Sequence, residues 1–262
     1  MLEFIVIVES SADARIATKL AERVIAEKVD GLEPDNLQSF FRWSGLEEQA
    51  GHSCWKDIRD IIERAKKLGL RIPKFLGHGQ DGSLKADGAA TKKILMLIQF
   101  LCHKKSRQVR AVLLIRDIDN QPARVEGIEQ VRSEHNGQQP KFEIIIGIAD
   151  RMREAWVLNG FIPSSSEEIQ SLEEIKTKLK FDPCEEAHRL RSNSWEEPDR
   201  ARNPKVVVKK LTGGDNSREQ QCWEETSLEI LRTRGIHTGL TAYLHEIEQR
   251  LVPVIRNPAQ SG

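Results

Sequence analysis

The chain has 262 residues, with 40 lysine and arginine side chains against 40 aspartate and glutamate side chains, so its formal net charge is zero. Hydrophobic residues make up 39% of the sequence, which allows a sizeable core and argues against disorder. The balanced charge argues against a globally basic nucleic-acid coat protein and a polybasic membrane binder. Local patches or a metal ion would therefore have to attract any anionic substrate.

The first part of the chain alternates short apolar runs with segments of helical periodicity. Continuous apolar runs, typical of strands buried on both faces, predict strands over 4–8, 109–115 and 142–148, and the segment 37–43 could form a further strand. Apolar side chains at helical spacing predict helices over 11–28, 53–68, 89–103 and 123–134. Strands separated by helices favour an α/β fold, with a mostly parallel sheet flanked by helices and right-handed crossovers.

The sequence after residue 150 has an almost wholly helical pattern. Helices are expected over 151–159, 166–180, 205–211, 217–234 and 239–251. We therefore divide the chain into an α/β domain over 1–160 and a helical C-terminal region over 161–262.

Several classes of protein are excluded by what the sequence lacks. The four cysteines are scattered without a CxxC pair, which argues for reduced thiols in a cytoplasmic protein. No apolar run approaches the roughly 18 residues of a membrane span, so no membrane association is expected. The glycine-rich loop over 77–88 lacks the P-loop pattern, and we expect no ATPase activity.

Acidic side chains follow three of the predicted strands where each strand ends. Glu9 follows the first strand, Asp117 and Asp119 follow the strand over 109–115, and Asp150 follows the strand over 142–148. Ligands of open parallel sheets bind at the carboxyl ends of the strands, so we expect these carboxylates to converge. Clustered carboxylates stay ionised most easily around a hard divalent cation such as Mg²⁺. A simpler interpretation of any single one of these acidic residues is that it forms a turn or caps the next helix.

These acidic motifs resemble those of the Toprim domain, the metal-binding fold of topoisomerases, bacterial primases and the overcoming-lysogenization-defect (OLD) nucleases. That family has a glutamate at the end of its first strand and a D-x-D at the end of its third. The matching positions are Glu9 in IVIVES and Asp117 and Asp119 in LLIRDIDN. OLD-type nucleases carry a second acid four positions after the glutamate, which corresponds to Asp13.

Two later segments extend the resemblance. IADRMREAWVLNGF is similar to the EAW-L signature of small stand-alone Toprim-like proteins that are encoded beside ATPases in bacterial anti-phage loci. Glu154 would be the acid of that signature, and NPKVVVKKL would supply a late lysine, Lys205, with Lys209 in reserve. Ser10 stands where the family usually has glycine after its first glutamate, and residues 37–88 would form an insertion.

The resemblance implies a Toprim-like metal-binding domain over 1–160 and a metal-dependent nuclease that works with an ATPase of the ABC or SMC-like type in anti-phage defence. Its substrate would be nucleic acid, with DNA favoured over RNA. Lys205 would offset charge in the transition state. Mg²⁺ or Mn²⁺ would be held by carboxylates drawn from one set of residues: Glu9, Asp13, Asp117, Asp119, Asp150 and Glu154.

Two alternatives from other classes stay open. The chain could be a non-catalytic Toprim-like subunit whose acidic edge is vestigial and whose helical C-terminal third docks on an ATPase. A phosphatase of the haloacid-dehalogenase type also uses a D-x-D, with the first aspartate as nucleophile. That hypothesis is disfavoured because Asn120 follows the motif, the motif is central in the chain, and Glu9 would be unexplained.

Overall fold

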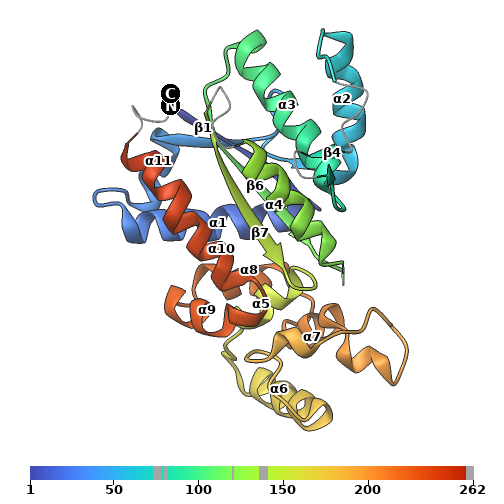
Figure 1. The fold of residues 1–262 in the computed structure, drawn as a ribbon. Helices are drawn as coiled ribbons and strands as arrows, with labels where there is room; N and C mark the ends of the chain where they lie inside the picture. The colour runs from blue at the N-terminus through green and yellow to red at the C-terminus, as the bar shows by residue number, and fades with distance from the viewer. Residues whose placement is uncertain (73–77, 80–81, 120, 136–140, 258–262) are drawn as a thin grey trace.

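The computed structural model describes residues 1–72, 78–79, 82–119, 121–135 and 141–257 (Figure 1). Its centre is a five-stranded sheet in which every strand pairs in parallel, in the order β2-β1-β6-β7, with β3 also pairing with β1. The α/β prediction is therefore confirmed. The strands are β1 Leu2–Val8, β2 Phe41–Ser44, β3 Ser53–Cys54, β6 Val109–Asp117 and β7 Glu143–Ala149.

Alternate residues of the central strands are buried on opposite faces of the sheet. In β1, Phe4, Val6 and Val8 enter one apolar cluster, whereas Ile5 and Ile7 enter the other. Successive side chains of a strand point to opposite faces, so a strand covered on both sides must be apolar throughout. This requirement explains the uninterrupted apolar runs in the sequence.

Helices cover both faces of the sheet (Figure 1). One face packs against α2 Ile58–Lys67, α3 Gly88–Lys105 and α4 Ala123–His135. The other face packs against α1 Ser11–Lys28 and helices of the C-terminal region. The bounds of α1 equal those expected from the sequence, because Ser10 takes an extended N-cap conformation and Val29 leaves the helix.

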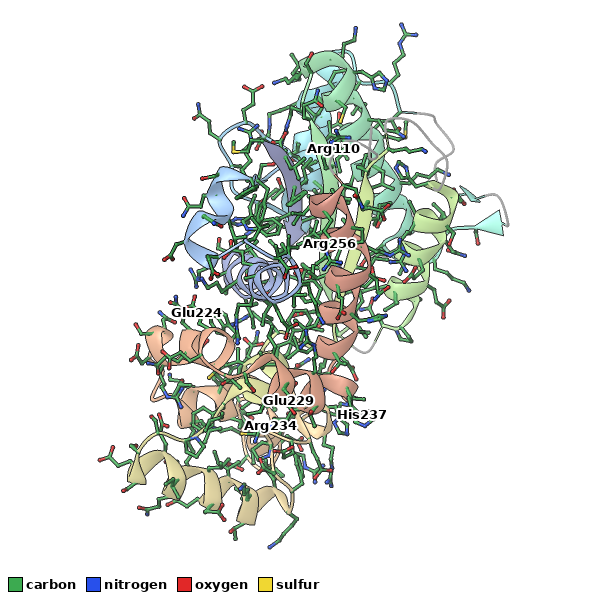
Figure 2. All side chains as sticks on the ribbon, turned by 90° about the vertical axis from the view of Figure 1, so that its left-hand side faces the viewer. Arg110, Glu224, Glu229, Arg234, His237 and Arg256 are labelled. Carbon is green, nitrogen blue, oxygen red and sulfur yellow. The ribbon has the colours of Figure 1, made fainter. Side chains whose placement is uncertain are left out.

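The C-terminal region is helical, as expected, and it returns to the sheet. Its α10 packs on β7 and the π-helical turn η6 packs on α1, so the apolar cluster of that face continues into these helices. Figure 2 shows Arg256 near the end of the C-terminal helices. The helices are α5 Glu154–Gly160, α6 Ser166–Leu179, α7 Pro204–Leu211, α8 Asn216–Glu224, α9 Leu228–Arg234, α10 Leu240–Glu246, η6 Ile247–Leu251 and α11 Val252–Arg256.

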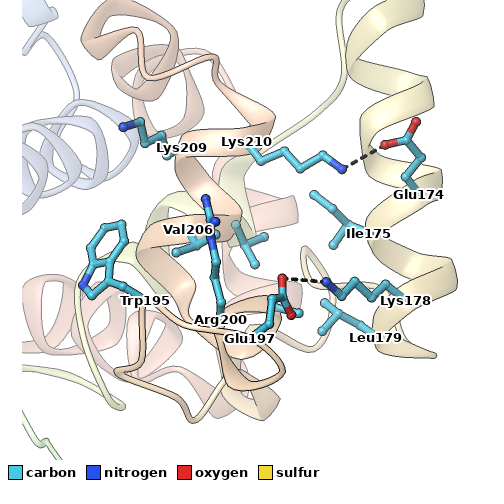
Figure 3. Close-up of a pocket in the computed structure, with 12 residues that line it drawn as sticks. Glu174, Ile175, Lys178, Leu179, Trp195, Glu197, Arg200, Val206, Lys209 and Lys210 are labelled. Carbon is cyan, nitrogen blue, oxygen red and sulfur yellow. Dashed lines mark hydrogen bonds and ion pairs between the residues drawn. The ribbon is translucent and has the colours of Figure 1, made fainter.

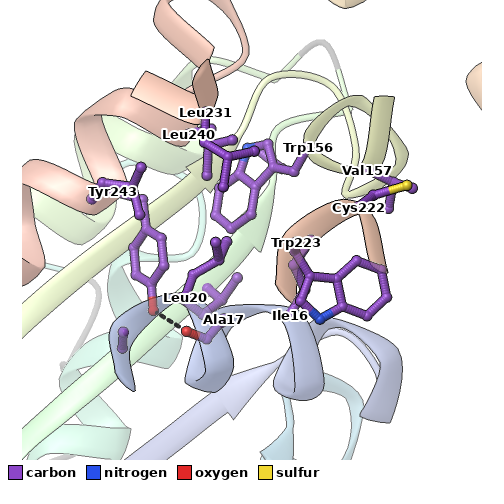
Figure 4. Packing of buried hydrophobic residues seen from close by; sticks show 14 of the residues in the cluster. Ile16, Ala17, Leu20, Trp156, Val157, Cys222, Trp223, Leu231, Leu240 and Tyr243 are labelled. Carbon is purple, nitrogen blue, oxygen red and sulfur yellow. Dashed lines mark hydrogen bonds between the residues drawn. The ribbon is translucent and has the colours of Figure 1, made fainter. Parts of the chain in front are cut away.

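Tyr243 of α10 joins the C-terminal region to α1 (Figure 4). Its ring stacks on that of Trp156 with centroids 5.2 Å apart, and its hydroxyl donates a hydrogen bond of 2.8 Å to the carbonyl of Ala17. Because both rings are fully buried, the polar tip of the tyrosine needs this partner.

Several predicted elements have different bounds in the structure. The strand expected over 37–43 is the 3₁₀ helix η1 Pro34–Ser39 followed by β2. The helix expected over 53–68 begins only at Ile58, after β3 and the 3₁₀ turn η2 Trp55–Asp57, because Ser53 and Cys54 pair with the end of β1. The helix expected over 217–234 is divided into α8 and α9, since Ser227 caps α9 through a hydrogen bond from the amide of Ile230.

The glycine-rich loop expected over 77–88 lies partly outside the described residues, and its described part contains the short antiparallel strands β4 His78–Gly79 and β5 Gly82–Ser83. Among the described helices, none combines the length and the apolar character needed to cross a membrane.

Candidate acidic site at the carboxyl ends of the strands

The carboxyl ends of β1, β6 and β7 lie at the same edge of the sheet, which we call the acidic edge. Asp117 is the last residue of β6 and pairs with Ala149 of β7. The chain then turns over the end of β7, and the amide of Asp119 donates a hydrogen bond of 3.3 Å to the carbonyl of Arg151. Asp119 and Arg151 both adopt left-handed backbone conformations, with φ of 48° and 64°. Such conformations are uncommon outside glycine and cluster at functional sites.

Asp117 is the electrostatic centre of the acidic edge. Burial, followed by the negative charges of Asp13, Glu154, Glu9 and Asp119, raises the pKa of Asp117 to about 8. Five of the six carboxylates expected at a metal site therefore act on one another. Among the described residues, no side chain donates a hydrogen bond to the Asp117 carboxylate or pairs with it.

Two arginines hold the outer carboxylates. The guanidinium of Arg116 pairs with Glu9 and also with Asp87, the residue before α3, at 2.7 Å. Arg124 of α4 pairs with Asp119 at 3.1 Å. Burial nevertheless raises the pKa of Glu9, which shows that Arg116 does not fully compensate for the loss of water.

A third arginine, Arg153, holds the acids on the α1 and α5 side. Its guanidinium lies 3.6 Å from Asp13, 3.1 Å from Glu154 and 3.5 Å from Glu219 of α8. Asp13 also accepts a hydrogen bond of 2.5 Å from the hydroxyl of Ser10. Ser10 thus fixes the orientation of a neighbouring carboxylate.

The remaining predicted residues lie differently. Asp150 follows β7, but its two oxygens each bind the guanidinium of Arg191 at 3.0 Å. Lys205 is exposed on α7, which packs against α5 and α6, and its backbone amide bonds the side chain of Asn203. Lys209, on the same helix, lines a separate cavity described below.

Arg151 is a residue of the acidic edge that sequence reasoning missed. It is only 4% exposed, and its Nε and Nη1 atoms are buried without a hydrogen-bond partner in the described structure. A buried charge without hydrogen bonds is costly, so these donors are suited to an anionic ligand. The only feature of the sequence that pointed to Arg151 is its position directly after Asp150. No feature of the sequence pointed to Asp87, Arg116 or Arg124 as residues of this site.

The donor chemistry of the acidic edge fits a hard divalent cation, because its candidate ligands are carboxylate oxygens and a cation would compensate the charge of the half-buried Asp117. The carboxylates, as they are arranged in the structure, do not form a complete metal-coordination site. Within the described residues, no three histidine, cysteine, aspartate or glutamate side chains are placed to hold a metal ion as they stand. Ion binding therefore requires Glu9 or Asp119 to turn away from its arginine.

The fold and this edge define a parallel α/β protein with an acidic site at the carboxyl ends of its strands. Comparison with known proteins takes the assignment no further, since no family model, no curated protein and no solved structure matches the chain.

Proposed function

We propose that the chain is a divalent-metal-dependent nuclease whose metal site is the acidic edge, with Glu9, Asp117 and Asp119 as the principal ligands. The observation that supports it best is the raised pKa of Asp117, a carboxylate surrounded by four others and compensated by no described cation. Like charges held together at a partly buried site are stabilised by a divalent cation. Asp13 and Glu154 both act electrostatically on Asp117, so they are the candidates to complete the donor set once side chains rearrange, whereas Asp150 is engaged by Arg191.

The proposed chemistry assigns distinct roles to the chain's own residues. A bound Mg²⁺ or Mn²⁺ supplies Lewis-acid stabilisation of the phosphodiester and its leaving oxygen. Asp117 carries a proton at pH 7 until a cation favours its ionised form, so ligand binding releases that proton. Arg151 offers unpartnered donors beside Asp119 for a phosphate oxygen. Lys205, implied by the family resemblance, is the other candidate for that role.

The proposal extends to the biological setting that the resemblance implies. The nuclease would act on DNA in preference to RNA, as the effector of a bacterial anti-phage system with an ATPase of the ABC or SMC-like type.

Cleavage of labelled single-stranded DNA, duplex DNA and RNA with and without Mg²⁺ or Mn²⁺ tests the proposal. Asp119→Ala should reduce cleavage by more than the roughly 10–100-fold that the loss of an outer-shell partner costs. The matched control is Asp60→Ala, which removes an exposed carboxylate from α2 and should cleave like the unaltered protein. Arg151→Ala and Lys205→Ala, compared in the same assay, decide which cation serves the reaction. Full cleavage activity of the Asp119→Ala protein would contradict the proposed mechanism.

The arginine pairs favour one second candidate, a non-catalytic subunit whose acidic edge is a structural ion-pair network. Each outer carboxylate already has an arginine partner, as such a network requires. If neither Mg²⁺ nor Mn²⁺ raises the melting temperature or supports cleavage of any nucleic acid, the subunit hypothesis replaces the nuclease. A phosphatase is disfavoured on the sequence pattern, because Asn120 follows the D-x-D motif and Glu9 would have no role.

A further inference from the structure

A cavity of about 590 Å³ lies between α6, α7 and the segment before α7, away from the acidic edge (Figure 3). Its aliphatic lining includes Ile175 and Leu179 of α6 and Val206 of α7, and the indole of Trp195 stands at its side. Trp195 is 57% exposed. The volume is in the range of about 300–1,000 Å³ that small-ligand sites occupy.

The charges around this cavity leave a net positive surface. Lys210 pairs with Glu174, and Lys178 pairs with Glu197, each at 2.9 Å. The remaining two cations of the lining, Arg200 and Lys209, have no acidic partner within the part of the chain that the structure describes. An exposed aromatic ring beside two uncompensated cations suits a ligand that has a flat ring and a negative charge.

The cavity is linked to the acidic edge by a short stretch of chain. Arg191 binds Asp150 just after β7, and Trp195 follows four residues later. The Cα atoms of Arg191 and Trp195 are therefore at most about 14 Å apart, and the extended side chain of Arg191 adds to the separation from Asp150. Nucleotides of a duplex strand are spaced about 3.4 Å apart along the axis, so a few nucleotides are enough to connect the two places.

We propose that this cavity binds an unpaired nucleotide of a single-stranded nucleic acid, whose backbone continues to the acidic edge. The base stacks on Trp195, and its phosphate is held by Arg200 and Lys209. Aromatic stacking combined with cationic backbone contacts is the chemistry of sequence-tolerant single-strand binding. A paired base has both faces covered by its neighbours, so the cavity selects unpaired strands. The connection to the acidic edge rests on the proposed nuclease function, whereas the binding itself does not.

Binding of a fluorescently labelled oligothymidylate to the full chain in metal-free buffer tests the site without cleavage. Trp195→Ala should weaken binding by about 5- to 100-fold, whereas Trp195→Phe, which keeps a stacking ring, should retain most of the affinity. Arg200→Ala and Lys209→Ala should each weaken binding and reduce the slope of affinity against salt by about one. Binding of a duplex of the same length should not respond to Trp195→Ala.

Matched controls separate the site from general effects. Phe40→Ala removes another exposed aromatic side chain, 46% exposed, and Arg59→Ala and Lys67→Ala remove single positive charges from α2. Each control should bind the oligonucleotide like the unaltered protein. Equal affinity of Trp195→Ala and the unaltered protein overturns the proposal, as do equal losses in the controls.

Further outcomes distinguish a nucleotide site from a protein-docking site. They also show whether the cavity assignment or the nuclease function has failed. If a peptide of glutamate and leucine residues binds in a manner that depends on Trp195 while the oligonucleotide does not bind, the cavity is a protein-docking site and the proposal is wrong. If oligonucleotide binding depends on Trp195 but no metal supports cleavage, the nuclease function fails while the cavity assignment stands. If a metal supports cleavage but Trp195→Ala does not affect oligonucleotide binding, the nuclease function stands and the cavity assignment fails.

Discussion

Replacing Asp117 with asparagine should stabilise the metal-free protein at neutral and alkaline pH, although it removes a proposed metal ligand. The unaltered carboxylate must either carry a proton or hold a negative charge beside Asp13, Glu154, Glu9 and Asp119. Asparagine has nearly the same shape but no charge to bury. The substitution therefore removes an electrostatic cost of folding, and a cost of this origin depends on pH.

The size of the effect follows from the shift of the pKa from 3.8 to about 8. The folded protein binds this proton more tightly than the unfolded chain, so Asp117 lowers stability progressively as the pH rises from about 4 to about 8. Each pKa unit is worth about 1.4 kcal/mol, so the cost at pH 7 is at most about 4 kcal/mol. Asp117 is half-buried, and screening by water reduces the expected value to about 2–4 kcal/mol.

Thermal unfolding in the presence of a chelator measures this difference. For a chain of this size, 1 kcal/mol shifts Tm by about 2–4 °C, so Asp117→Asn should raise Tm by about 4–16 °C near pH 8 and by much less at pH 5. Asp60→Asn, on the exposed face of α2, should not change Tm at either pH. Added Mg²⁺ should reduce the difference in Tm between the two proteins, because it should bind the protein that retains the carboxylate more tightly and stabilise it more. A gain in Tm that is the same at pH 5 and pH 8 would refute the reasoning.

Two further predictions concern the fold. Glu3→Gln should cost about 1.5–3 kcal/mol in urea unfolding, because it removes the buried negative charge that pairs with Arg107 at 2.7 Å, whereas the carbonyls of Leu46 and Gly45 still accept hydrogen bonds from that guanidinium; an unchanged urea midpoint would contradict this. Gly160→Ala should cost about 1–3 kcal/mol, since an ideal Cβ there would lie 1.9 Å from the carbonyl oxygen of Cys222. Gly51→Ala, whose Cβ would meet open space, is the control and should be neutral.

The elements that sequence reasoning predicted best are those whose burial is dictated locally. The apolar runs of β1, β6 and β7 require cover on both faces, which makes a parallel sheet with helices on either side the natural arrangement. The strand over Ser53–Cys54 could not be predicted, because its two residues are extended only through pairing with the end of β1. The break before α9 was hidden by continuous helical periodicity, although Ser227 is a good N-cap.

In the candidate site, too, the sequence predicted what depends on local position and missed what depends on the tertiary fold. Strand-end positions could be inferred for Glu9 and Asp117 because parallel strands share one carboxyl edge. The arginine partners could not, because an ion pair such as Arg153 with Asp13 joins residues 140 positions apart in sequence through the tertiary fold alone. The hydrogen bond between Ser10 and Asp13 is different, because it is local: the two residues are three positions apart at the start of α1.

These arginines also explain why Asp117 should govern ion binding. The side chains of Glu9 and Asp119 are 32% and 46% exposed, whereas those of Arg116 and Arg124 are 13% and 16% exposed. Both arginines keep Asp87 as a partner, at 2.7 and 3.6 Å, when a divalent cation takes their outer carboxylate, and this remaining pair limits the cost of the exchange. Asp117 has no described partner to lose, and a cation would reverse the repulsion that raises its pKa. Most of the free energy of binding should accordingly come from Asp117, so its replacement should weaken metal binding more than replacement of either outer carboxylate.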